Sequence, residues 1–238
     1  MPADLTVLAI ADRDFLPRLE VLAASLARNT PSAHLHACLV NVAPADAERL
    51  RAVHRHTELR YECAVLDAVH VEIGLDGVTP FTEKAGYCVN RRGRAILDLL
   101  HDGCRRVLFV DADTIVRRDL GPLCELIDRH DLVIHKRPEA PEFMRVAGGV
   151  IGVRPTNAAI EFFTRAVAHI DAIGNRKFFS DQLAFHLTIE ELAGRVGVGH
   201  LPKKFIDWDF DERSFIWVGK GRRKHENAQY LAEERSYV

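Results

Sequence analysis

Short apolar runs alternate with segments of helical periodicity from residue 5 to residue 66. Leu5–Ile10 is rich in strand-forming residues, and His34–Val42 and Tyr61–Leu66 predict two further strands. Between them, leucines recur at helical spacing as far as Asn29, and Pro44 begins a second helical segment. Strands that alternate with helices at this pace are typical of a parallel, doubly wound α/β sheet flanked by helices.

The rest of the chain continues this pattern. A helix is predicted from Thr82 to Leu100, and the densest apolar strand, Val107–Val110, follows it. The later segments are a strand at Asp131–His135, a glycine-rich strand at Gly148–Val153, helices from Pro155 to Ile173, from Ser180 and from Glu226, and an irregular stretch at Leu201–Trp217. No internal repeat, low-complexity tract or linker interrupts the order. We therefore expect residues 1–238 to form one α/β domain.

Composition excludes several classes of protein. Hydrophobic residues make up 47% and charged residues 28%, which is a normal globular balance. The net charge of -2 gives no field that would recruit nucleic acid or an anionic membrane. No apolar run approaches the ~18 residues of a membrane span. The first residues lack a basic segment and their apolar run breaks at Asp12, so we expect no export by a standard signal peptide. The five cysteines form no CxxC pair, so we expect reduced thiols in a cytoplasmic protein.

Two aspartates directly follow the densest apolar strand. Residues i and i+2 of a strand point to the same face, so Asp111 and Asp113 can aim at one point beyond the strand end. Ligands of open α/β sheets bind at this edge. Two carboxylates suit Mg²⁺ or Mn²⁺, which would neutralise a diphosphate leaving group. The alternative is that the aspartates only end the strand, since Asp is common in turns.

A second chemistry also fits these residues. Val107–Thr114 matches the hhhhDxDxT nucleophile motif of haloacid dehalogenase-type phosphatases, in which Asp111 would be the nucleophile. That family normally places the motif on its first strand and needs a later paired acidic motif. Here 110 residues precede Asp111 and no such motif follows, so we rank this alternative below the metal site.

Five dispersed segments resemble the retaining GT-A glycosyltransferases of family 8, which include glycogenin and bacterial lipopolysaccharide galactosyltransferases. The first is the stretch that ends in Ala11, Asp12, Asp14 and Phe15, which looks like the uridine-binding turn of that family. The resemblance implies that Asp12 contacts the uracil edge and that Phe15 stacks on the base. The alternative is that Phe15 is a core residue and Asp12 a helix cap.

The second and third segments concern the donor phosphates and the metal. The helix before the Asp-Ala-Asp strand presents Asn90 and Arg94, and Arg94 lies at the spacing from Asp111 at which the family places a donor-binding arginine. By the same resemblance Asp111, Ala112 and Asp113 form the DxD motif, with the two aspartates as ligands of Mn²⁺ or Mg²⁺. The alternative is that Arg91, Arg92 and Arg94 simply form a solvent-exposed face of this helix.

The fourth and fifth segments concern the sugar. Gly148 and Gly149 resemble the family's Asn-x-Gly segment, although Ala147 replaces its polar residue, and two glycines also fit a β-bulge. Asp181 and Gln182 resemble its Asp-Gln pair, in which Asp binds sugar hydroxyls and Gln lies near the anomeric carbon. The alternative is a helix start, for which Ser180 and Asp181 are suited.

The carboxyl-terminal region departs from the family pattern. The family has a His-x-x-Gly-x-x-Lys arrangement whose histidine is the third metal ligand, but Ile216 stands at that position. Water or His225, ranked ahead of His200, would then complete the coordination, or the aspartates and the diphosphate alone would hold the metal. Glycines and cations remain that could approach and hold the diphosphate: Gly219, Lys220, Gly221, Arg222 and Lys224.

The resemblance implies a metal-dependent transfer of a sugar from a UDP-sugar to a carbohydrate or other acceptor, with retention of anomeric configuration. Residues 1–115 would form the nucleotide-binding half and residues 116–238 the sugar and acceptor half. A sugar nucleotidyltransferase is disfavoured because the turn at Ala11–Asp14 has no glycine. A non-catalytic sugar-nucleotide-binding or carbohydrate-binding protein of the same fold stays open because Ile216 and Ala147 depart from the pattern.

Overall fold

A seven-stranded sheet forms the centre of the computed structural model, which describes residues 4–66, 71–73, 75, 77, 80–173 and 177–237. The strand order is β10-β8-β9-β6-β1-β2-β3, and only β9 runs antiparallel to its neighbours. The strands are β1 Thr6–Asp12, β2 His34–Val40, β3 Thr57–Glu62, β6 Val107–Val110, β8 Leu132–Lys136, β9 Val146–Val153 and β10 Val198–His200.

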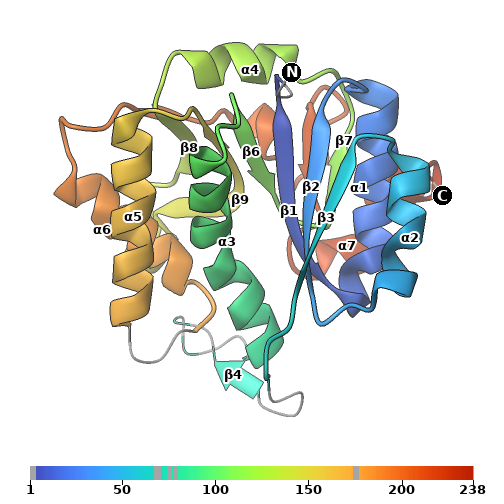
Figure 1. Cartoon of the computed structure of the whole chain (residues 1–238), viewed down its shortest axis with the longest axis horizontal. Helices are drawn as coiled ribbons and strands as arrows, with labels where there is room; N and C mark the ends of the chain where they lie inside the picture. The colour runs from blue at the N-terminus through green and yellow to red at the C-terminus, as the bar shows by residue number, and fades with distance from the viewer. Residues whose placement is uncertain are drawn as a thin grey trace.

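Helices cover both faces of this sheet (Figure 1). Side chains alternate along β1, so that Val7 and Ala9 join one apolar cluster while Leu8 and Ile10 join the other. The first cluster includes residues of α1, α2 and α4, and the second includes residues of α3, α5 and α6. The helices are α1 Leu16–Asn29, α2 Pro44–Val53, α3 Glu83–His101, α4 Gly121–Asp128, α5 Asn157–Ala172, α6 Ser180–Glu191, α7 Arg223–Glu226 and α8 Ala228–Arg235.

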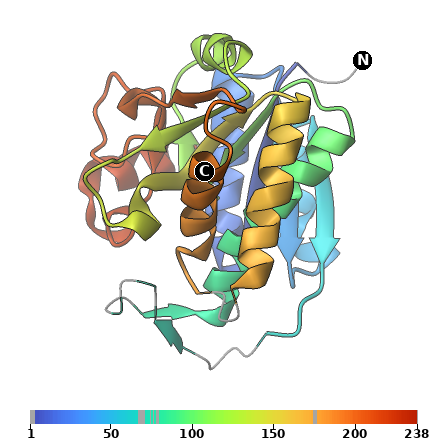
Figure 2. The same ribbon diagram turned by 90° about the vertical axis from the view of Figure 1, so that its left-hand side faces the viewer.

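Two small ladders add to the main sheet. β7 (Thr114–Val116) pairs antiparallel with β11 (Ile216–Val218), which joins the segment after the two aspartates to the carboxyl-terminal region. β4 (Val71–Ile73) pairs with β5 (Pro80–Thr82). In both views this second ladder lies beside the amino-terminal end of α3 (Figures 1 and 2). Thr82 then caps α3, because its side chain accepts a hydrogen bond from the backbone N–H of Ala85.

The strand order creates a switch point beside β1. The chain passes from β1 to β2 and β3 on one side, then crosses to β6 on the other side. Pairing between β1 and β6 ends at Leu8 and Phe109, two residues before Asp111. Ligands of open α/β sheets bind at such a point, outside the carboxyl ends of the strands. Asp12 and Asp111 both lie at this edge.

The expected doubly wound α/β sheet is confirmed, and several element boundaries are corrected. The third strand lies at Thr57–Glu62 instead of Tyr61–Leu66, because an edge strand exposes alternate side chains and lacks a continuous apolar run. Helix α5 begins at Asn157 instead of Pro155 because Thr156 caps it. The irregular stretch Leu201–Trp217 contains a 3-10 turn, η3 (Lys203–Phe205), and the start of β11. Helix α4 had no clear sequence signal.

All five cysteines have free thiols. Burial raises the pKa of Cys38 and of Cys88 to about 12, whereas Cys63 is exposed. Within the described ranges, none of the helices has both the length and the apolar character to span a bilayer.

Candidate active site at the switch point

Asp111 and Asp113 follow β6 at the switch point. The backbone N–H of Asp111 donates to the carbonyl of Gly149 on β9. Hydrogen bonding to β9 therefore continues one residue beyond the end of β6. Ala112 is buried in the core between the two aspartates. The side chain of Asp111 is 35% exposed, whereas that of Asp113 is only 9% exposed. The two carboxylates therefore differ in their access to solvent and ligands.

The carboxyl-terminal region holds Asp113 from two directions. Lys224 Nζ donates to Asp113 Oδ2 at 2.7 Å. The hydroxyl of Tyr230 and the backbone N–H of Gly219 both donate to the carbonyl of Asp113, at 2.8 Å and 2.9 Å. Burial raises the pKa of Asp113 to about 6, although the Lys224 ammonium opposes this rise. A buried carboxylate in this position is therefore stabilised by a protein cation.

Arg92 of α3 joins the two acidic groups of the site. Its Nη2 lies 3.3 Å from Asp111 Oδ1, and its Nε lies 3.2 Å from Asp181 Oδ2. The guanidinium is buried and lies over the Phe109 ring, with Cζ 4.9 Å from the centroid. Asp181 is also buried, and burial raises its pKa while Arg92 lowers it. Arg92 thus connects the aspartate at the end of β6 with the start of α6.

The two glycines of β9 make room for this arrangement. A Cβ atom at Gly148 would collide with Arg92 Nη1 and would lie 3.0 Å from Asp181 Oδ2. A Cβ atom at Gly149 would lie 2.7 Å from Asp111 Oδ2. Any larger residue at either position would push the arginine or the aspartate away. Both glycines are therefore needed because β9 packs closely against Arg92 and Asp111.

Gln182 follows Asp181 on the first turn of α6. Its Oε1 accepts a hydrogen bond from Arg137 Nη2 at 3.0 Å, and the same nitrogen donates to the carbonyl of Val146. Arg137 comes directly after β8, and burial lowers its pKa. The amide of Gln182 is therefore oriented by an arginine that the sequence reading did not select.

The amino-terminal turn lies at the same edge of the sheet. Asp12 is buried, and its Oδ1 accepts hydrogen bonds from the backbone N–H groups of Asp14 and Phe15. Lys84 Nζ lies 3.2 Å from Asp12 Oδ2 and 2.6 Å from Asp14 Oδ2, and this contact lowers the pKa of Asp14. Ala11 is buried beneath the turn. Asp12 therefore caps the turn that follows it, and the same turn places Asp12 and Asp14 beside Lys84.

Lys224 also connects this turn to the Asp-Ala-Asp segment. Its Nζ lies 4.6 Å from the centroid of the Phe15 ring, while it donates to Asp113. Phe15 is half-buried against the core beneath α1. One lysine side chain therefore brings the proposed base-binding residue and the proposed metal ligand into a single site.

Three expected donor-binding residues lie elsewhere or serve other contacts. Arg94 is half exposed, and its Nη2 lies 3.5 Å from Asp171 on α5. Asn90 Nδ2 donates to the carbonyls of Gly86 and Lys177, which leaves Asn90 Oδ1 buried and without a hydrogen bond from any described residue. Arg222 is exposed at the start of α7. The structure thus brings Arg92, and not Arg94, to the aspartates.

The site residues that the sequence reading missed are Lys84, Arg92 and Arg137. A signal for Arg92 does exist in the sequence. Helix α3 buries Gly93, Ile96 and Leu100, and Arg92 extends this apolar stripe toward the amino terminus of the helix. A charged residue on a buried stripe needs a partner of opposite charge, which here is supplied by Asp111 and Asp181.

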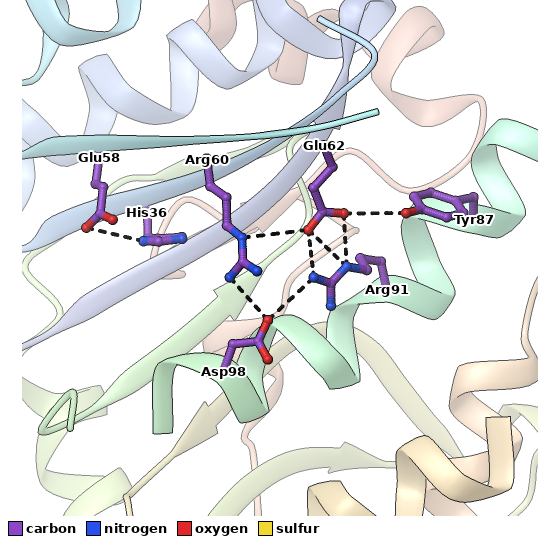
Figure 3. A network of polar contacts seen from close by, with 7 residues as sticks. All are labelled: His36, Glu58, Arg60, Glu62, Tyr87, Arg91 and Asp98. Atoms are coloured by element: carbon purple, nitrogen blue, oxygen red, sulfur yellow. Dashed lines mark hydrogen bonds and ion pairs between the residues drawn. The ribbon is translucent and has the colours of Figure 1, made fainter. Parts of the chain in front are cut away.

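A network on the opposite side of α3 fixes the helix against β3 (Figure 3). Arg91 donates to both carboxylate oxygens of Glu62, and Tyr87 Oη lies 3.4 Å from Glu62 Oε2. Asp98 adds contacts to Arg91 and to Arg60. Tyr87 and Arg91 therefore face the edge of the sheet and not the candidate site. Their role is to hold the helix that carries Arg92.

The glycine-rich segment after β11 lies over the aspartates. A Cβ atom at Gly219 would lie 2.9 Å from Lys224 Cβ and 2.9 Å from Tyr230 Oη, so glycine is required there. Gly221 has φ of 61° and faces open space. Lys220 is half-buried, and burial together with Arg137, Arg223 and Lys203 lowers its pKa to about 8.

The donor set at the aspartates fits a hard divalent cation. Asp111 and Asp113 offer carboxylate oxygens, which Mg²⁺ and Mn²⁺ combine with phosphate oxygens and water. Ile216 is buried in β11, so no histidine stands at the position where the family has one. His225 contacts Arg18 at 3.4 Å, and His200 accepts from the backbone N–H of Lys136. A cation here would displace Lys224 or Arg92 from one carboxylate.

A second group of possible metal ligands lies on α6 and the 3-10 turn η2 (Glu142–Met144). Ligand atoms of Glu142, His186 and Glu190 lie within 4.8 Å of one another. Arg145 Nη1 lies 3.1 Å from His186 Nε2, so the nitrogen of His186 that could bind a metal already contacts an arginine. These residues were not expected from the sequence.

The fold and the acidic switch point define an α/β protein with a ligand site beyond the carboxyl ends of its strands. The sequence model of the nucleotide-diphospho-sugar transferase family matches residues 82–230, which is more than half of the chain, so the chain belongs to this family. This match agrees with the family 8 resemblance and removes the phosphatase interpretation of Asp111. Among curated proteins, no sequence matches the chain.

Solved structures confirm the GT-A fold. An active-site mutant of LgtC superposes with a TM-score of 0.65 at 16% identity, over 97% of this chain and 93% of that one. The galactosyltransferase LgtC in complex with donor and acceptor sugar analogs gives 0.64 at 15% identity, over 98% and 96%. The apo glycosyltransferase GlyE of Streptococcus pneumoniae TIGR4 gives 0.66 at 13% identity, over 96% of this chain and 59% of GlyE.

Proposed function

We propose that this protein transfers a sugar from UDP-sugar to an acceptor hydroxyl, with Mn²⁺ or Mg²⁺ bound by Asp111 and Asp113. The observation that supports this most is the contact of one buried arginine, Arg92, with both Asp111 and Asp181. It joins the proposed diphosphate end of the donor site to the proposed sugar end. Residues 1–115 form the nucleotide-binding half, and residues 116–238 form the sugar and acceptor half.

The base would bind at the amino-terminal turn. Phe15 offers an aromatic face, and Asp12 Oδ2 is held at the edge of the turn by Lys84. A carboxylate can accept a hydrogen bond from the imide N–H of uracil, which supports UDP as the nucleotide. Asp14, which pairs with the same lysine, would lie beside the ribose.

The diphosphate would lie over the aspartates. When bound, the divalent ion neutralises charge on the phosphate oxygens as the bond to the sugar breaks. Lys224, released from Asp113, and Lys220 offer ammonium groups from the segment that follows Gly219, and the exposed Arg222 extends it. Gly219 and Gly221 allow the backbone to approach the phosphates.

The sugar would lie between α6 and β9. Both oxygens of Asp181 are buried and accept no hydrogen bond of normal geometry from the described residues, so sugar hydroxyls could donate to them. Gln182 is held by Arg137 and would position the amide beside the anomeric carbon. A neutral amide is a poor nucleophile, so we favour a positioning role for Gln182 in a retaining transfer.

Two measurements test the assignment. UDP with Mn²⁺ should stabilise the protein more than GDP, ADP or CMP does. At a concentration ~100 times its dissociation constant, UDP should add about 2.7 kcal/mol to the free energy of unfolding of the unliganded protein. Asp111→Asn and Asp113→Asn should remove both this metal-dependent binding and turnover, while Asp102→Asn, which changes a surface aspartate at the end of α3, should leave both unchanged. Full transfer by Asp111→Asn in the presence of chelator would refute the metal assignment.

The alternative is a non-catalytic binding protein of the same fold. It is favoured by Ile216 and by the two protein cations that already pair with the aspartates. Slow hydrolysis of UDP-sugar to free sugar and UDP separates the two functions, because a transferase can pass its sugar to water. Tight binding of UDP-sugar without any hydrolysis would favour the alternative.

A further inference from the structure

We propose that the acceptor of this transferase carries an anionic group, a phosphate or a carboxylate, which binds a cluster of cations around Trp208. This proposal rests on the proposed transfer function. The cationic cluster consists of Lys203 and Lys220, whose ammonium groups lie over Trp208, and of Arg137 and Arg223, whose charges lower the pKa of Lys220 in addition to burial. Its members come from the residue after β8, from η3, from the segment after β11 and from α7.

Two ammonium groups meet at one aromatic ring. Lys203 Nζ lies 3.1 Å and Lys220 Nζ lies 4.4 Å from the centroid of Trp208. His135 contacts the same ring edge-on, with the ring centroids 5.6 Å apart. Each cation is attracted to the indole face, but the two ammonium groups repel each other. Such an arrangement is stabilised when an anion binds between the cations.

The cluster is short of negative charge. Lys203 has two acidic neighbours, Asp209 at 3.2 Å and Asp207 at 3.7 Å. The oxygens of Asp207 already accept hydrogen bonds from the backbone N–H groups of Asp209 and Asp211. Among the described residues, no carboxylate lies within ion-pair distance of Lys220 or of Arg137. Positive charge from Arg137, Arg223 and Lys203 accordingly lowers the pKa of Lys220, in addition to the effect of burial.

An unused hydrogen-bond donor adds an independent observation. Arg137 Nε is buried and has no hydrogen-bond partner among the described residues. Its Nη2 donates to Gln182 and to the carbonyl of Val146. A buried donor without a partner is unfavourable, so a ligand oxygen that accepts from it would contribute to binding.

The position of the cluster favours the acceptor over the donor. Lys220 is the one member of the cluster that we also place near the diphosphate, which has Lys224 and Arg92 at the aspartates as well. Arg137 instead contacts Gln182, which we place beside the anomeric carbon. An anionic group held by Arg137 and Lys203 would bring a neighbouring hydroxyl of the same molecule toward that carbon. Trp208 cannot stack on a neutral sugar through the ring face that Lys203 covers.

The test measures binding of small probes to the full chain in the presence of UDP and Mn²⁺. The probes are glucose, glucose 6-phosphate and glucuronate, titrated by calorimetry. We expect each anionic probe to bind about tenfold more tightly than glucose, because hydrogen bonds between ions are about twice as strong as neutral ones. Comparison of glucose 6-phosphate with glucuronate then shows whether the cluster prefers a phosphate or a carboxylate. Equal affinity for all three probes would overturn the proposal.

Paired variants of adjacent lysines give the control. Lys203→Gln should raise the dissociation constant of the preferred anionic probe at least about fivefold, whereas Lys204→Gln should not, because Lys204 is exposed and contacts the Phe205 and Phe215 rings. Arg223→Gln serves as a second variant on an exposed helix if Lys203→Gln fails to fold. If Lys203→Gln instead weakens UDP binding and spares the probe, the cluster belongs to the donor site and the proposal fails.

The same titration separates this proposal from the proposed function. Absence of any UDP binding to the unmodified chain refutes the nucleotide-sugar assignment. UDP binding without discrimination between glucose and the anionic probes refutes only the anionic acceptor.

Discussion

Lys224 Nζ lies 2.7 Å from Asp113 Oδ2, although 111 positions of the sequence separate the two residues. The lysine is only 15% exposed and the aspartate 9%, so the pair is largely shielded from water. A protein cation therefore stabilises the buried carboxylate in the free protein. A metal ion bound by Asp113, as we propose, would compete with Lys224 for this oxygen.

We expect Mn²⁺ to bind weakly to the free protein and more tightly once UDP is present, because the diphosphate gives Lys224 a new partner. Lys224→Met should increase the affinity of the nucleotide-free protein for Mn²⁺ by about tenfold, since one unit of competing charge is removed. It should also lower the free energy of unfolding, because Asp113 is left buried without its cation. Calorimetric titration with Mn²⁺ measures the first effect. Lys204→Met is the control, and unchanged Mn²⁺ affinity in Lys224→Met would contradict the competition.

Arg92 and Arg94 offer a matched comparison within one helix. Arg92→Met leaves Asp111 and Asp181 without their shared cation and should cost about 3–5 kcal/mol of unfolding free energy, together with the loss of UDP-sugar binding. Arg94→Met should change the unfolding free energy by less than about 0.5 kcal/mol, because its partner Asp171 is exposed. Urea unfolding and UDP-sugar titration check both variants. If Arg94→Met abolished donor binding and Arg92→Met did not, Arg94 would be the donor-binding arginine and our assignment of Arg92 would be wrong.

Substitutions of Gln182 and Asp181 should affect turnover and donor binding differently. Gln182→Ala should lower turnover by ~10²-fold with little change in donor affinity, as for the loss of one oriented polar group in a transition state. Asp181→Ala should weaken donor binding as well, because a carboxylate can accept from sugar hydroxyls in the ground state. Steady-state kinetics and donor titration distinguish these outcomes. A glycosyl adduct found on either side chain by mass spectrometry would overturn the positioning role, and an inverted product anomer would overturn the retaining reaction.

The cysteines should differ sharply in reactivity at alkaline pH. The reactive species is the thiolate, and burial raises the pKa of Cys38 and Cys88 to about 12. At pH 8 their thiolate fraction is then on the order of 10⁻⁴, and it grows only as the pH rises toward 12. A disulfide reagent should therefore modify the exposed Cys63 first, and Cys63→Ser should remove this fast phase. Fast modification of Cys88 in the folded protein would contradict the burial.

The fold and the family were predictable because they depend on local patterns. The apolar run Val107–Val110, the turn at Asp12 and the alternation of strands with helices are each visible within a few residues. The GT-A fold and the family assignment are accordingly confirmed. The edge strand Thr57–Glu62 was misplaced because half of its side chains face solvent and give no apolar run.

The contacts within the site were harder to predict because they depend on the pairing of distant segments. Counting positions from Asp111 selected Arg94, whereas the rotation of α3 that is fixed by Glu62 and Arg91 turns Arg92 toward the aspartates. Arg137 follows β8 and reaches Gln182 across 45 positions, a relationship that no local motif encodes. The assigned roles of the site residues stay predictions until the variants are measured.

The connection of Tyr230 and Gly219 to the carbonyl of Asp113 also sets the order in which the site can assemble on the ribosome. A growing chain contains both aspartates long before the two residues that donate to that carbonyl have been made. Domains begin to fold as they are synthesised, at ~5–20 residues per second. During the several seconds between these events Asp113 has neither its lysine nor its tyrosine, so only Asp111, beside Arg92, has a cation available at this edge of the nascent sheet. Divalent cations in the surrounding solution could occupy that edge before the carboxyl-terminal segment closes over it.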